Sequence, residues 1–166
     1  MTGEGTVRLR PPDNTLSERA VGWWRTRLLV AAFGPVAVLG VLAASIGPAT
    51  TWLLAAAVAV AVIGVAGAVF FPSWWYRLHR WEVTDEAVYI RTGAFWQEWR
   101  IAPMSRIQTV DTVRGPLERV FRLSTVTVTT ASSKGALRIE GLDHELAAEL
   151  AAQLTRVTQA TPGDAT

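Results

Sequence analysis

Charged side chains are missing from one long stretch of this chain. The 166 residues include 16 Lys or Arg and 14 Asp or Glu, yet residues 28–71 contain none of these and no His. Cysteine is absent altogether, which excludes disulfides, thiolate metal sites and cysteine nucleophiles. His79 and His144 are the only histidines, too few for a histidine-rich metal site, and a net charge of +2 makes no general case for nucleic acid. We therefore expect no metal, no cofactor and no nucleic-acid partner.

The uncharged stretch consists of two apolar runs. Residues 28–46 and 52–71 are separated only by "GPATT", in which Gly-Pro breaks a helix. As a helix, each run is long enough to cross the hydrocarbon core of a bilayer, which is roughly 30 Å thick. The sequence therefore predicts two transmembrane spans that return on each other as an antiparallel hairpin. Because no ionisable group lies within the spans, the hairpin is typical of an anchor and not of a transport path.

Basic residues flank the hairpin at its two free ends and are missing from its turn. The positive-inside rule then places both termini in the cytoplasm, and we expect the plasma membrane as the location. These arginines either attract anionic lipid or serve topology alone, and both interpretations stay open. The residues expected at the membrane interfaces are Arg19, Trp23, Trp24, Arg25, Arg27, Trp52, Trp74, Trp75, Arg77 and Arg80.

Small residues form a stripe on each predicted span. One stripe comprises Ala57, Ala61, Gly64 and Ala68, and the other comprises Ala32, Gly40 and Ala44. Such stripes let two helices approach closely. Packing within the hairpin is the simpler interpretation, and homo-oligomerisation is the alternative.

After the hairpin the hydrophobic period changes from helical to alternating. Strands are expected at 87–92, 95–101, 107–113, 124–130 and 136–140, between Gly, Pro and Asp turn signals. A helix follows from residue 144, capped by Asp143, with its apolar stripe at Leu146, Leu150, Leu154 and Val157. We divide the chain into a flexible lead (1–16), a juxtamembrane helix with the hairpin (17–75), a barrel domain (76–158) and a disordered tail (159–166).

Several motifs carry a resemblance to a known family. "WEVTDEAVYIRTGAF", "IAPMSRIQTVDTVRGPLERVFRL", "VTVTTASSKG" and "RIEGL" resemble the bacterial pleckstrin-homology-like (PH-like), membrane-flanked domain family, the YdbS-like group, over about residues 17–158. That family commonly has Gly where this chain has Arg122. The resemblance implies an α+β fold in which a two-helix transmembrane hairpin precedes a seven-stranded antiparallel barrel capped by a C-terminal helix. No enzymatic activity is known for that family as such. The resemblance also implies a membrane complex with larger relatives that carry several copies of the domain.

The stretch 106–123 holds the candidate binding residues. Phosphoinositide-binding PH domains use basic residues in their first hairpin, but here that hairpin tip (84–87, "TDEA") is acidic, so we do not expect a phosphoinositide ligand. Two interpretations of the stretch stay open. Its arginines form ion pairs within the fold, with Asp111, Glu118 or Glu98, and hydrogen bonds at the corner, or they bind an anionic lipid or a partner's carboxylate. The candidate surface comprises Arg106, Gln108, Arg114, Arg119 and Arg122.

Catalysis has little support in the sequence, because nothing links Ser132, Ser133 and His144 into a nucleophile with its base. We therefore expect a protein that is not an enzyme. The leading hypothesis is a cytoplasm-facing scaffold module that binds another membrane protein, a multi-copy relative being one candidate. The alternative is a module that binds anionic lipid at the inner leaflet.

Overall fold

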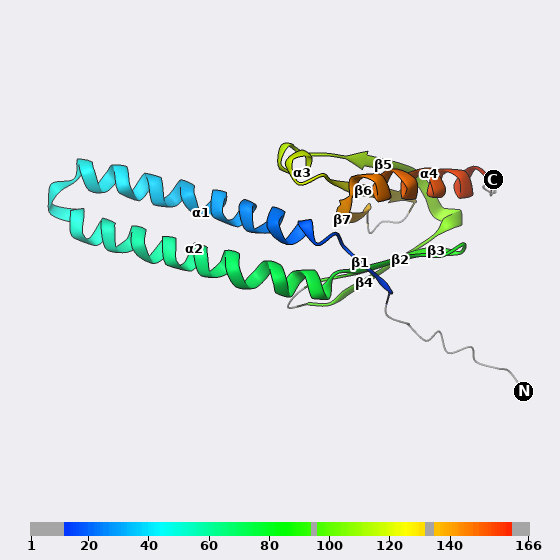
Figure 1. Ribbon diagram of the computed structural model, residues 1–166, viewed down its shortest axis with the longest axis horizontal. Coiled ribbons are helices and arrows are strands. Elements are labelled where there is room, and N and C mark those ends of the chain that lie inside the picture. The colour runs from blue at the N-terminus through cyan, green and yellow to red at the C-terminus, as the bar shows by residue number, and fades with distance from the viewer. Residues whose placement is uncertain (1–11, 94–95, 132–134, 161–166) are drawn as a thin grey trace, which may run out of the picture.

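Two long helices form a hairpin that projects from a compact β domain (Figure 1). The structure is a computed structural model and describes residues 12–93, 96–131 and 135–160. Helix α1 spans Arg19–Ser45 and α2 spans Thr50–Leu78, joined by the short helix η1 (Gly47–Ala49). Both helices are long and apolar enough to cross a membrane. The second expected span (52–71) lies within α2, and the first (28–46) ends one residue beyond α1, at its C-cap Ile46. Each helix continues beyond its span toward the β domain.

The two helices of the hairpin pack through their small residues. Ala57 and Ala68 are buried, and a Cβ added to Gly64 would lie only 2.5 Å from the Cβ of Ala32. The predicted packing within the hairpin is therefore confirmed at these positions. Gly40 and Ala44 do not share in it, since a Cβ on Gly40 would have no neighbour within 4 Å and Ala44 is exposed.

The β domain contains seven antiparallel strands in two sheets, as the resemblance implied. One sheet has the order β1-β2-β3-β4 and the other has the order β5-β6-β7. The pairing of strand β3 with strand β4 runs without a register shift from Glu98 to Pro103, which pairs with Ala87. The strands are β1 (Asn14–Thr15), β2 (Arg80–Val83), β3 (Ala87–Thr92), β4 (Glu98–Pro103), β5 (Ile107–Val113), β6 (Leu123–Thr130) and β7 (Leu137–Asp143), with the short helices η2 (Met104–Arg106) and α3 (Pro116–Val120) among them.

The first strand comes from the segment expected to be a flexible lead. Asn14 pairs with Trp81 and Thr15 with Arg80, so β1 extends the first sheet from a position before the hairpin. Leu16 follows it and is buried in the core. The assignment of residues 14–16 to a flexible lead is therefore wrong, because Asn14 and Thr15 pair with β2 and Leu16 is buried. Residues 1–11 and 161–166 of the expected lead and tail lie outside the described residues.

The base of the hairpin belongs to the core of the β domain. Ala20, Trp23 and Trp24 of α1 are buried in the same hydrophobic cluster as Val126 of β6 and Leu142 of β7. The expected boundary at residue 75 consequently does not separate two cores. Burying two tryptophans there stabilises the junction, since a large aromatic side chain removes 150–250 Å² from water.

Helix α4 (His144–Ala160) packs against the second sheet, β5-β6-β7 (Figure 1). The N-terminus of α4 is capped as predicted, because the Glu145 N–H donates a hydrogen bond to Oδ1 of Asp143 at 3.1 Å. Leu150 and Leu154 are buried, as expected, and Ala147 is buried with them. Leu146 was expected in this stripe but is exposed.

Candidate functional site: an arginine groove at the base of the hairpin

A short helical corner between β5 and β6 organises the site. Pro116 occupies the first turn of α3, where its missing N–H costs nothing. The Glu118 carboxylate accepts one hydrogen bond from the Gly115 N–H (2.5 Å) and one from Oγ1 of Thr125 (2.7 Å). The corner is therefore held by a buried carboxylate whose two oxygens are both engaged.

Arg122 ends this corner with a left-handed backbone, with φ of 54°. Its carbonyl accepts a hydrogen bond from the His144 N–H at 3.1 Å, which joins the corner to the start of α4. The family pattern commonly places Gly here, and Gly adopts this conformation without steric cost. A non-glycine residue in this conformation raises the free energy of the folded state by about 1 kcal/mol. The backbone is therefore strained at Arg122, whose guanidinium group belongs to the candidate surface.

Four arginines gather at this corner around a groove of about 420 Å³. We call it the arginine groove. Three of its arginines come from the predicted candidate surface, and the fourth belongs to the first turn of α1. The groove is lined by Arg19, Arg114, Arg119, Arg122, Asp143, His144 and Glu145. Four cations face two carboxylates, which leaves an excess of two positive charges with His144 neutral.

Two of these arginines have partners and two do not. Nη1 of Arg19 contacts Asp143 at 2.9 Å, and Nε of Arg114 donates to the Leu123 carbonyl at 3.1 Å. Within the part of the chain that the structure describes, no side-chain hydrogen bond or ion pair is made by Arg119 or Arg122. Both side chains are exposed. Their guanidinium groups are therefore available to a ligand.

The carboxylates expected to neutralise the arginines are engaged elsewhere. Glu98 pairs with Arg100 at 3.1 Å, Asp111 accepts from Thr109 at 3.3 Å, and Glu118 holds the α3 corner. The predicted ion pairs between these carboxylates and the 106–123 arginines are therefore wrong for Arg119 and Arg122. The reason is that each carboxylate finds a closer partner on its own strand or corner.

Arg106 and Gln108 do not reach the arginine groove. Both are exposed near the start of β5, whereas Arg114 follows the end of that strand. Seven extended residues span roughly 20 Å. The candidate surface expected from the sequence therefore divides into a groove and two remote residues.

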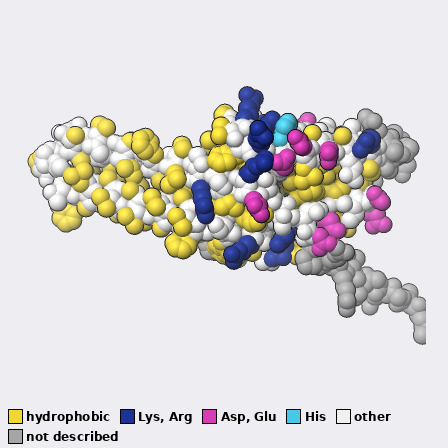
Figure 2. Space-filling model, in the orientation of Figure 1, with side chains coloured by type: hydrophobic (Ala, Val, Ile, Leu, Met, Phe, Trp, Pro, Cys, Tyr) yellow, Lys and Arg dark blue, Asp and Glu magenta, His cyan; other side chains and the backbone are white. Residues whose placement is uncertain are grey.

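The arginine groove lies at the end of the β domain nearest the hairpin. Basic side chains gather where the hairpin meets the β domain, and apolar side chains cover the hairpin beyond (Figure 2). A Cβ on Gly22 of α1 would lie 3.0 Å from the Phe121 ring, so the corner touches α1. Gly22 precedes the uncharged stretch that begins at Leu28 by six residues, or roughly 9 Å of helix.

The residues expected at the membrane interfaces have different surroundings. Trp23 and Trp24, with 5% and 6% of their surface exposed, contact protein instead of presenting their rings to headgroups. Trp52, at the turn end, is 81% exposed. Arg25 donates to Oγ of Ser73 at 3.3 Å, and Arg27 lies over the Trp23 ring at 4.9 Å. Trp74 and Arg77 are exposed, and Trp75 and Arg80 are half-buried. For the exposed residues, the interface assignment stays a prediction.

A serine and a histidine meet beside the groove, a pair that the sequence analysis missed. Oγ of Ser124 and Nδ1 of His144 lie 3.1 Å apart. Such a pair resembles a nucleophile with its base. However, Ser124 is completely buried, so no substrate reaches its hydroxyl. The contact instead satisfies a buried hydroxyl and orients the histidine at the rim of the groove.

The chain combines a two-helix hairpin with seven antiparallel strands and a C-terminal helix, and the base of the hairpin shares their core. This combination defines a membrane-anchored protein of the PH-like class. The family model described as "Bacterial PH domain" matches residues 27–158, and the chain belongs to that family. It is also 29% identical over 158 residues to the UPF0699 transmembrane protein YdbS of Bacillus subtilis (strain 168). The alignment covers 92% of this chain and 97% of that protein.

Among solved structures, the Spt16D Pob3N heterodimer aligns with 48% of this chain and 79% of the matched chain. It does so at 10% identity and a TM-score of 0.37, which is too low to inform function.

Proposed function

We propose that this chain is a non-catalytic, membrane-anchored module whose arginine groove binds the phosphate of an anionic phospholipid at the cytoplasmic leaflet. The observation that carries the proposal is the pair Arg119 and Arg122. Their guanidinium groups lack protein partners among the described residues and lie in a groove with two excess positive charges. A phosphodiester is a good match, since guanidinium groups bind phosphate oxygens through paired hydrogen bonds.

The position of the groove favours a lipid over a soluble anion. The α3 corner touches α1 near the start of the uncharged stretch, which puts the groove close to headgroup level. Val120 of α3 is 75% exposed at the same end of the β domain. An exposed valine beside basic residues suits the boundary between headgroups and acyl chains.

Lipid retention by the full-length chain tests this proposal. The protein is purified in mild detergent with equal amounts of phosphatidylglycerol and phosphatidylcholine, and bound lipid is measured by native mass spectrometry. Each basic group near an anionic surface contributes about 1 kcal/mol, so removing two should lower the preference for phosphatidylglycerol about 30-fold. The test variant is Arg119→Gln with Arg122→Gly. It should fold at least as well as wild type, because Gly relieves the left-handed strain at position 122.

The matched control is Arg106→Gln, which removes an exposed arginine remote from the groove and should retain the preference. High salt should weaken phosphatidylglycerol retention by the wild type. Unchanged phosphatidylglycerol retention in the double variant would overturn the proposal.

A protein scaffold is the second candidate, and the free sheet edges favour it. In the sheets that the structure describes, β4 and β5 each pair with a strand on one side only, whereas the outer edge of β7 is partly taken by the Ser17 N–H, which donates to the Gly141 carbonyl. A free edge accepts an added strand from a partner. Recovery of one membrane protein by wild type and by the double variant alike, without enrichment of anionic lipid, would support this second function in place of the first.

A further inference from the structure

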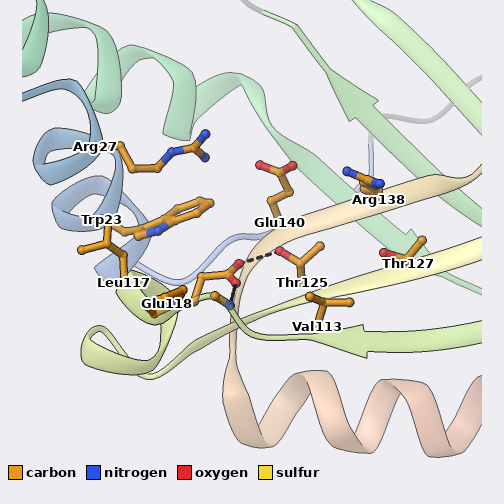
Figure 3. A pocket seen from close by; sticks show the side chains of 11 residues that line it. Trp23, Arg27, Val113, Leu117, Glu118, Thr125, Thr127, Arg138 and Glu140 are labelled. Carbon is orange, nitrogen blue, oxygen red and sulfur yellow. Dashed lines mark hydrogen bonds between the residues drawn. The ribbon is translucent and has the colours of Figure 1, made fainter. Parts of the chain in front are cut away.

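A second hollow lies on the other side of the α3 corner, between α1 and the second sheet. It has a volume of about 460 Å³, and Figure 3 shows side chains from α1, α3, β5, β6 and β7 around it. A neighbouring hollow of about 610 Å³ shares Arg27 and Glu140 with it and is otherwise mainly apolar, with Trp24, Leu28, Ala31 and Trp75 in its wall. We call the two together the crevice.

The charges of the crevice balance, unlike those of the arginine groove. Two arginines, Arg27 and Arg138, face two carboxylates, Glu118 and Glu140. The Glu118 oxygens are engaged at the corner, whereas Glu140 is half-buried and has no hydrogen bond or ion pair in the part of the chain that the structure describes. A half-buried carboxylate without a partner favours a cationic group beside it.

Arg27 and Glu140 face the same space without forming an ion pair within 4.0 Å. The Arg27 guanidinium lies over the Trp23 ring at 4.9 Å, which holds it at the mouth of the crevice. In Figure 3, the Glu140 carboxylate on β7 points into the hollow opposite Arg27 on α1. A ligand that bridges them needs an anionic and a cationic group on one short frame.

The crevice also lies at the level where lipid headgroups meet acyl chains. Arg27 is the last charged residue before the uncharged stretch, and Leu28 and Ala31 on the same helix line the apolar half. An amphiphile therefore finds charged groups at one end of the crevice and aromatic and aliphatic surface at the other.

We infer that the crevice binds one zwitterionic phospholipid whose headgroup carries a phosphate and a primary ammonium. Arg27 holds the phosphate, Glu140 accepts hydrogen bonds from the ammonium, and an acyl chain lies along Leu28, Ala31 and Trp75. A net-anionic headgroup fits less well here, because the charges of the crevice already balance and such a headgroup offers no ammonium to Glu140. The site is separate from the arginine groove and takes a different lipid class.

Competition between two zwitterionic lipids tests this inference. The full-length chain is purified in mild detergent with equal amounts of phosphatidylethanolamine and phosphatidylcholine, and retained lipid is measured by native mass spectrometry. A quaternary ammonium donates no hydrogen bond, so the wild type should prefer phosphatidylethanolamine about tenfold, as expected for a hydrogen bond to a charged group. Glu140→Gln should abolish the preference, and Arg27→Gln should reduce retention of both lipids.

The matched control is Glu149→Gln, an exposed carboxylate on α4 that lines neither hollow and should keep the preference. Equal retention of both lipids by the wild type, or a preserved preference in Glu140→Gln, would overturn the inference. Arg27→Gln serves if Glu140→Gln unfolds, because Arg27 is exposed on α1. The arginine-groove double variant should keep the phosphatidylethanolamine preference, so failures of the two proposals are distinguishable.

Discussion

Both ends of the hairpin carry tryptophan, one at the turn end and four at the open end, and these side chains have different environments. At the turn end, Trp52 is exposed and contacts none of the β domain's core. At the open end, Trp24 is buried and packs edge-on against Trp75, with ring centroids 6.1 Å apart. The open end is therefore part of the β domain, and the hairpin and the strands form one structural unit. An anchor built this way holds the surface around α3 at a defined height and orientation relative to the spans.

The largest expected effect comes from removing a tryptophan at the open end. Trp24→Ala should lower the free energy of unfolding of the β domain by about 3–5 kcal/mol, because it leaves a cavity in the shared core. Guanidinium unfolding in detergent, followed by far-UV circular dichroism, measures this loss.

Trp52→Ala is the matched control at the turn end and should change the same quantity by less than about 0.5 kcal/mol. Equal losses from the two substitutions would contradict the difference between the two ends. Such a result would mean that the hairpin and the β domain do not share a core.

A smaller loss is expected where α1 meets β7. Gly141 has φ of 75°, and a Cβ there would lie 2.9 Å from the Cβ of Ala20. Gly141→Ala should therefore lower stability by about 2–4 kcal/mol, through left-handed strain and crowding together. Hydrogen exchange of the β7 amides measures it.

Gly135 provides a close control, since its φ is 77° but an added Cβ there meets nothing within 4 Å. Gly135→Ala should cost only the backbone strain, about 1–2 kcal/mol. If both substitutions had the same effect, the close contact between α1 and β7 would not contribute to stability.

The smallest effect is expected in the middle of the hairpin. Gly64→Ala should cost about 1–3 kcal/mol, because its Cβ would overlap that of Ala32 and separate the two helices. Thermal unfolding in detergent and a spin-label distance between α1 and α2 measure the two consequences. Gly40→Ala, with open space around it, should leave the distance unchanged and should not lower the unfolding temperature, because Ala favours a helix more than Gly does. An unchanged distance in Gly64→Ala would show that the helices are not packed through this glycine.

Local patterns were enough to predict most of the fold and only part of the site. The charge-free stretch and the β-branched alternations placed both spans and five of the six strands after the hairpin, at least approximately, because these signals depend on near neighbours. The strand β2 (Arg80–Val83), directly after the second span, was not predicted. Arg114, Arg119 and Arg122 were also found, since one corner carries them. Arg19 was not assigned to this site, because it contacts Asp143 from 124 residues away in the sequence.

What the sequence by itself determined is the chemistry of each segment. It specifies an uncharged hairpin that favours a membrane, strands that need a shared core, and a corner rich in arginine. Only the tertiary structure decided that Leu16, Trp23 and Trp24 enter that core, and that Arg119 and Arg122 stay unpaired among the described residues. The physical reason is that burial and ion pairing depend on which distant segments meet, and that is a property of packing and not of any single stretch of chain.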